Sequence, residues 1–180
     1  MKTLSEVEVR EWCEQPSIAI VINRYGLLSF EKNNRCLATI EAPLESEQKV
    51  ALSHSLLSFQ QFYGGLLWIK EWRMGELEVT ATGWRVLENM RRGMGHLEPV
   101  EATSGHLFRA DEFRDAHAFL SVTLLWSWQA FWVPATPGYF YYLHHNNKVE
   151  LAARDEKTLA ELQAYFSGWR PVAGSALGVS

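Results

Sequence analysis

Cysteine is scarce in this sequence, since Cys13 and Cys36 are the only two among 180 residues. Two cysteines cannot form the disulfide framework that stabilises small secreted domains, and their spacing fits no zinc-binding pattern. The six histidines supply no HxxxH, HExxH or HxH pair that could complete a metal site. We therefore expect free thiols in a reducing cytoplasm, no bound metal and no cofactor.

Runs of basic residues are also missing. The chain has 17 Lys and Arg residues against 21 Asp and Glu residues, which gives a formal net charge of −4. Because phosphate neutralisation supplies most of the affinity of nucleic-acid-binding proteins, we expect no nucleic-acid partner. The N-terminal stretch MKTLSEVEVREWCEQ is amphipathic and acidic and has no apolar signal-peptide core. This pattern favours a cytoplasmic protein.

Motifs for nucleophilic catalysis and for phosphate binding are absent as well. No GxSxG motif occurs, and the glycines at 63–65 and 93–95 follow predicted helices. A phosphate cradle needs its glycines before a helix, where free N–H groups point at the anion. Any active site must therefore assemble in three dimensions from distant residues. The candidates for such a site are Glu71, His106, Asp111, His117 and His144.

The most distinctive segment present is residues 118–143, which contain no charged residue and no histidine but nine aromatic residues. Pro134, Pro137 and Gly138 would end any helix within it. The remaining stretch, 118–133, would reach only about 24 Å as a helix, whereas a bilayer core is about 30 Å thick. The segment therefore predicts a core helix followed by core strands, and no membrane span.

Alternation of apolar and polar residues predicts strands at 17–22, 27–32 and 35–41, joined as an N-terminal antiparallel meander. Asn33-Asn34 is typical of the second turn, because asparagine tolerates positive φ. The alternative interpretation makes 17–25 a helix. Further strands are predicted at 66–72 and 129–133, and the clearest hairpin joins 139–144 to 148–154.

Helical spacing of apolar residues predicts five helices. They cover 4–15, 46–63 with a glycine stop at Gly64-Gly65, 77–92, a segment beginning at Asp111, and a segment capped by Asp155. Residues 93–110 are expected to form a long loop. The predicted core includes Leu120, Leu124, Phe131, Val133, Phe140 and Leu162.

Together these elements predict an α+β fold, with a mainly antiparallel sheet (N-terminal meander plus C-terminal hairpin) covered by about five helices. Residues 1–170 are expected to form one domain, and the small, uncharged residues 171–180 a flexible C-terminal tail.

The surplus of Trp and Tyr is the best indication of function. We expect Trp128, Trp132, Tyr139 and Tyr141 to form an exposed aromatic surface that binds another protein. The sequence thus favours a non-enzymatic protein-binding module of the immunity, inhibitor or adaptor type, and a homo-oligomer is compatible with it. Three alternatives stay open: the aromatic residues are core covered by helices, exposed Trp residues bind a carbohydrate or small ligand, or the chain is an enzyme.

Overall fold

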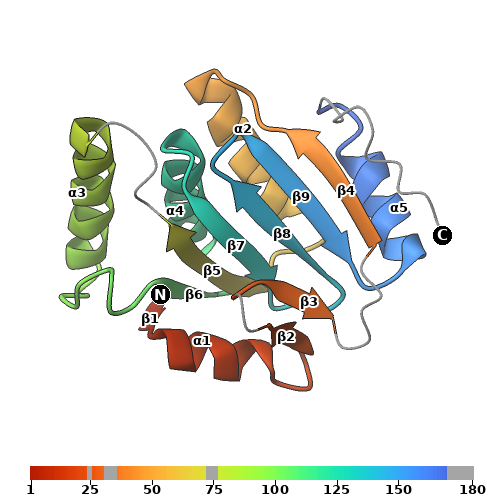
Figure 1. Cartoon of the computed structure of the whole chain (residues 1–180), viewed down its shortest axis with the longest axis horizontal. Coiled ribbons are helices and arrows are strands. Elements are labelled where there is room, and N and C mark those ends of the chain that lie inside the picture. The colour runs from red at the N-terminus through yellow and green to blue at the C-terminus, as the bar shows by residue number, and fades with distance from the viewer. Residues whose placement is uncertain (24–25, 31–35, 72–76, 170–180) are drawn as a thin grey trace.

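The computed structural model (Figure 1) describes residues 1–23, 26–30, 36–71 and 77–169, without the side chains of Glu71 and of 77–81. Seven antiparallel strands form one sheet in the order β1-β6-β5-β7-β8-β9-β4. Their bounds are β1 Lys2–Leu4, β4 Cys36–Glu41, β5 Gly64–Glu71, β6 Gly105–Arg109, β7 Gln129–Pro134, β8 Tyr139–His144 and β9 Lys148–Ala153. The strands β2 (Ile20–Ile22) and β3 (Leu28–Phe30) form a separate antiparallel hairpin.

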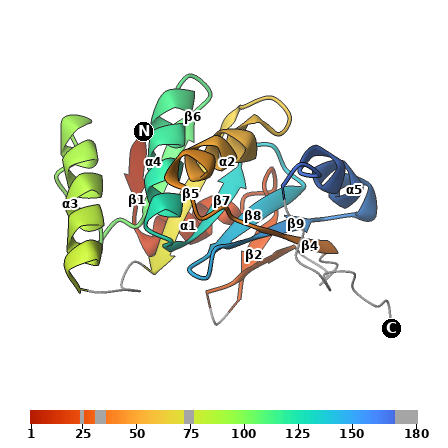
Figure 2. The ribbon, with the colours of Figure 1, turned by 90° about the horizontal axis from the view of Figure 1, so that it is seen from above.

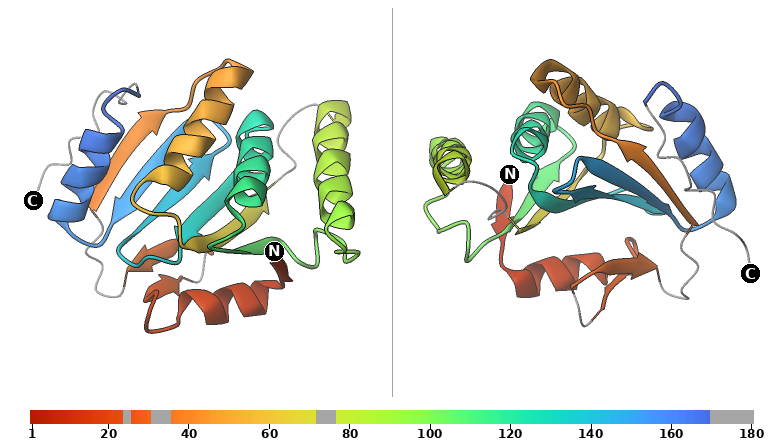
Figure 3. Two further views of the ribbon diagram at one scale, coloured as in Figure 1. Left: turned by 180° about the vertical axis from the view of Figure 1, so that it is seen from behind. Right: turned by 45° about the horizontal axis from the view of Figure 1, so that its top comes forward.

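Helices cover one face of the sheet, and the N-terminal elements cover the other. The helices are α1 Glu6–Cys13, α2 Ser46–Ser58, α3 Leu77–Gly93, α4 Phe113–Leu125 and α5 Glu156–Tyr165. Figures 2 and 3 show α2, α4 and α5 on one side of the sheet, and α1 with the β2–β3 hairpin on the opposite side. Within the described residues, no helix is both long and apolar enough to cross a membrane.

The sheet separates two hydrophobic cores, and neighbouring residues of one strand serve both. In β7, Trp132 belongs to the core beneath the helices, while Phe131 belongs to the core beneath α1 and the hairpin. Successive side chains of a strand point to opposite faces, so a sheet covered on both sides needs apolar residues at nearly every position. The dense run of aromatic residues in β7 and β8 follows from this requirement.

The predicted fold class, the β8–β9 hairpin and the cap of the last helix are confirmed. Tyr139 pairs with Ala153 at one end of the hairpin and His144 with Lys148 at the other. Asp155 caps α5 by accepting a hydrogen bond from the backbone N–H of Thr158 at 2.8 Å. All six predicted core residues are buried: Leu120, Leu124, Phe131, Val133, Phe140 and Leu162.

The third strand of the predicted meander has a different partner. The residues of β4 pair with β9 rather than with β3, and the predicted turn at Asn33-Asn34 lies outside the described residues. Ala38 and Ile40 join the helix-side core together with Leu151 of β9. Burial in this distant core, rather than the local turn, decides the pairing. The alternative of a helix over 17–25 is also wrong, because β2 lies there.

Two further boundaries differ from the prediction. Helix α2 ends at Ser58 instead of Tyr63, because Phe59 is extended and Gln60 has a φ of 59°. This change of direction turns Phe59 inward, where its ring lies 5.0 Å from that of Tyr139. Gly64-Gly65 consequently begins β5 rather than ending a helix.

The predicted loop over 93–110 contains the strand β6. It is inserted between β1 and β5, and β1 was not predicted either. A Cβ atom at Gly105 would lie 2.4 Å from the side chain of Val9 in α1. Gly105 is thus required for close packing of α1 against the strand.

Candidate functional site

The four aromatic residues expected on an exposed surface are all buried. The exposed fractions are 2% for Trp128, 1% for Trp132, 4% for Tyr139 and 0% for Tyr141. Trp132 stacks on Phe62 with ring centroids 6.2 Å apart, and the Tyr139 hydroxyl donates to the carbonyl of Phe59. The expectation of exposure is therefore wrong, because the helices cover this face of the sheet.

The candidates for an enzyme lie in unrelated surroundings. His106 is fully buried in β6, and burial together with nearby Arg91 lowers its pKa to about 3. Asp111 is exposed and pairs with Arg109, with 3.3 Å between Nε and Oδ1. The Nε2 atom of His117 lies 3.2 Å from the carbonyl oxygen of Val50. The side chain of Glu71 is not among those that the structure describes.

His144, the remaining candidate, is the last residue of β8. Its ring lies against that of Tyr142, with ring centroids 3.9 Å apart. Nothing in these contacts assembles the candidates into a catalytic group. Among the described residues, no cluster of three His, Cys, Asp or Glu side chains could hold a metal ion.

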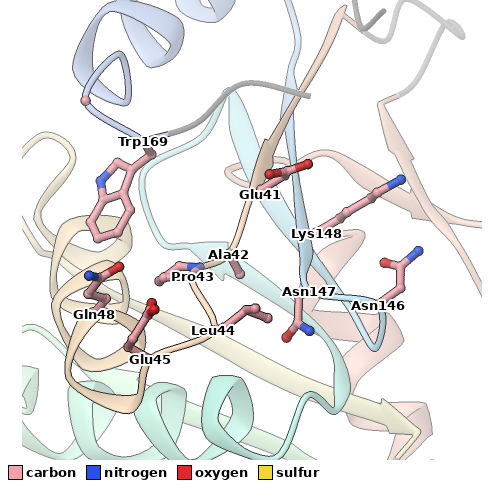
Figure 4. Close-up of a pocket in the computed structure, with 11 residues that line it drawn as sticks. Glu41, Ala42, Pro43, Leu44, Glu45, Gln48, Asn146, Asn147, Lys148 and Trp169 are labelled. Atoms are coloured by element: carbon pink, nitrogen blue, oxygen red, sulfur yellow. The ribbon is translucent and has the colours of Figure 1, made fainter. Parts of the chain in front are cut away.

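A groove of about 620 Å³ opens where β4 ends and the chain turns toward α2. In Figure 4, Trp169, Gln48 and Glu45 stand on one side of it and Asn146 and Lys148 on the other. It is lined by Glu41, Ala42, Pro43, Leu44, Glu45, Gln48, Asn146, Asn147, Lys148, Gly168 and Trp169. The groove thus combines one partly exposed aromatic ring with carboxylates, amides and an ammonium group.

A smaller hollow of about 270 Å³, here called the side pocket, shares Trp169 with the groove. It lies between β4 and the end of α5, and it is mainly apolar. Its lining residues are Ala38, Thr39, Ile40, Leu151, Gln163, Phe166, Ser167 and Trp169. Groove and side pocket therefore follow one another along β4, with Trp169 between them.

Strand β4 forms one edge of the sheet, and no described strand pairs with its outer side. The backbone N–H of Ala42 donates to the carbonyl of Asn147 at 2.8 Å, in register with the β4–β9 pairing. Backbone groups of alternate residues point to the same side in an antiparallel pair. The N–H and C=O groups of Leu37, Thr39 and Glu41 therefore point outward, beside the side pocket and the groove.

One wall of the groove is held by a buried lysine. The Nζ atom of Lys49 donates to the Oγ atom of Ser127 at 3.2 Å, and this hydroxyl donates to Oδ1 of Asn147 at 3.1 Å. Lys49 is only 6% exposed, and its burial lowers its pKa. Ser127 and Asn147 have φ values of 51° and 56°, so both turns are held in the left-handed region.

Sequence reasoning did not find this site. Trp169 lies beyond α5, which ends at Tyr165. No motif connects positions 41–48, 146–148 and 168–169. The one signal in the sequence is the pair of acidic residues, Glu41 and Glu45, that flanks Pro43 between the predicted strand 35–41 and the predicted helix 46–63.

Comparisons with known proteins add no functional information. No family model matches the chain, and neither the curated proteins nor the solved structures gave a significant match. The function must therefore be argued from the geometry of the groove, the side pocket and the edge of β4.

Proposed function

We propose that the chain is a non-enzymatic protein-binding module that takes an extended segment of another protein along the outer edge of β4. The observation that carries the proposal is that both hollows follow this one strand edge, the side pocket at Ala38–Ile40 and the groove from Glu41 onward. The binding surface differs from the one expected from the sequence, but the class of function is the same.

The outward backbone groups of β4 supply the affinity in this proposal. A segment laid beside Leu37, Thr39 and Glu41 would pair with their N–H and C=O groups as an added strand. In this mode of recognition, main-chain hydrogen bonds give affinity and pockets for alternate side chains give specificity. The end of α5, which Figure 1 shows beside β4, and Trp169 would form the second wall.

The form of β4 also limits indiscriminate pairing at its open edge. Unpaired strand edges attract other chains, and proteins limit this with short strands, charges or a covering helix. β4 has six residues, ends at the exposed Glu41, and is flanked by α5. Such an edge resists indiscriminate pairing, while a segment with matching side chains can still bind.

Proline substitution at Thr39 tests the proposal. Proline removes an outward N–H without removing a hydrogen bond to β9, which is the position where edge strands tolerate it. The probes are peptides selected for binding from a library of ten-residue sequences. Their affinity should fall at least about 10-fold for Thr39→Pro and change little for Thr39→Val. Peptide binding should slow hydrogen exchange of β4 only in the Thr39→Val variant. Equal affinity of both variants would contradict strand addition.

A second candidate function is carbohydrate binding at the groove. It is favoured by Trp169 together with the amides of Gln48, Asn146 and Asn147, since an aromatic face and amide groups suit a sugar. A glycan array distinguishes the two functions. A sugar that binds in a Trp169-dependent manner, and is unaffected by Thr39→Pro, would replace the protein-binding proposal.

A second copy of the chain is one further occupant that the edge of β4 would accept. Sedimentation over a range of concentrations reports such self-association directly. Dimers that dissociate on Thr39→Pro would identify the bound segment as β4 of a neighbouring copy, and would still support strand addition at this edge.

A further inference from the structure

We infer that the bound segment presents two side chains to this protein: a large apolar one for the side pocket and a Lys or Arg for the groove. This inference rests on the proposed function, strand addition to β4, and it specifies the sequence of the partner. It follows from the different chemistry of the two hollows on either side of Trp169.

The side pocket is suited to one large apolar side chain. Ala38, Ile40, Leu151 and Phe166 line it and are buried in the helix-side core. Its polar groups, from Thr39, Gln163 and Ser167, carry no charge. A charged side chain would lose its hydration here without gaining an ion pair. A Leu, Met or Phe of the partner would instead gain the free energy of leaving water, so its replacement by Ala should weaken binding about 10- to 100-fold.

The groove is suited to a cation on the side of Glu45. In Figure 4 the Glu45 carboxylate lies on the side of Trp169 and Gln48, opposite the ammonium group of Lys148. Glu45 is exposed and forms no ion pair with another described residue. The ring of Trp169 lies beside Gln48 and Glu45 in Figure 4. A Lys or Arg here would meet a carboxylate and the face of an indole together, and both attract a cation.

The two side chains must be an even number of residues apart. Both hollows contain Trp169, so they lie on the helix side of β4. Side chains of an added strand that face this side recur at every second residue, about 6.8 Å apart. The partner therefore carries its apolar and basic residues at positions i and i+2 or i and i+4, in either order.

Binding of synthetic peptides to the full chain tests the inference. A peptide from the library that binds is compared with versions in which its Lys or Arg becomes Gln, or its large apolar residue becomes Ala. Each is measured against the unaltered protein, Glu45→Gln and the control Glu47→Gln, which changes an exposed acid of α2 outside the groove. The expected result is that Glu45→Gln removes the preference for the basic peptide and Glu47→Gln keeps it.

The outcomes separate the inference from the proposed function. If selected peptides bind and slow the exchange of β4 but show no common apolar–basic pattern, the inference is wrong and strand addition stands. If Glu45→Gln and Glu47→Gln have equal effects on the basic peptide, the assignment of the groove is wrong. If no peptide of the library binds, the proposed function itself fails.

Discussion

Lys49 and Ser127 are joined by a hydrogen bond of 3.2 Å between Nζ and Oγ, although α2 carries the lysine and the turn after α4 carries the serine. Through Ser127 the lysine also fixes Asn147, which lines the groove. Burying a lysine amine costs free energy unless its donors are used. The hydrogen bond to Ser127 uses one of these donors, so the buried lysine and the wall of the groove depend on each other.

Lys49→Met should loosen this wall of the groove. Methionine fills the same buried space without a donor, so we expect a small change in thermal stability but faster hydrogen exchange at 145–148. Peptide binding should weaken several-fold. Lys157→Met, an exposed substitution in α5, is the control. Unchanged exchange at 145–148 would show that the lysine does not hold this turn.

His106 should make the fold sensitive to mild acid. Its pKa is about 3 in the folded chain against an ordinary value of 6.5, so below pH 6.5 the unfolded chain binds the proton and the folded chain does not. Stability contributed by neutral His106 is complete above pH 6.5 and falls by up to about 1.4 kcal/mol per pH unit as the pH drops toward 3. The free energy of unfolding is measured by urea denaturation at several pH values between 7 and 4.5. Its decrease with falling pH should be shallower for His106→Leu than for the unaltered protein, and unchanged for the exposed His54→Gln. Parallel slopes for all three proteins would refute the assignment.

Leu124 lies in the helix-side core and is 5% exposed, whereas Leu97 is 78% exposed. Leu124→Ala should lower the free energy of unfolding by about 2–5 kcal/mol, the range for truncating a core leucine. Leu97→Ala makes the same chemical change in water and should alter the free energy by less than about 0.5 kcal/mol. Chemical denaturation of both variants checks this pair.

Gly83 allows α3 to approach the end of α4. A Cβ atom at this position would lie 2.4 Å from the ring of Trp126. Gly83→Ala should therefore destabilise the fold by about 1–3 kcal/mol through overpacking, despite the higher helix propensity of alanine. At Gly93, where a Cβ atom would meet nothing within 4 Å, the same substitution should be tolerated. Equal melting temperatures of the two variants would contradict the contact with Trp126.

Local patterns predicted the elements whose partners are close in the chain. The β8–β9 hairpin and the cap at Asp155 depend on a few neighbouring residues, and both were predicted. The partner of β4 could not be predicted, because alternation shows that a strand has a buried side but not which distant strand it joins.

The same limit explains why the site was missed. Trp132 and Tyr141 are of residue types that are common at binding surfaces. Only the placement of the helices shows that these two residues belong to the core. The groove combines the turn after β4, the β8–β9 turn and Trp169, three segments with no common sequence signal. Its chemistry exists only after tertiary packing.

The pairing of β4 with β9 has a consequence for the order of events during synthesis. β4 ends at Glu41, whereas β9, its only strand partner within the described structure, begins at Lys148. Contacts between such distant segments form late, because a long loop must close first. On the ribosome, the edge proposed to receive a partner would remain unformed until β9 has been made. Chains that stop before β9 would thus lack a receptive strand and could not compete for a partner of the proposed edge.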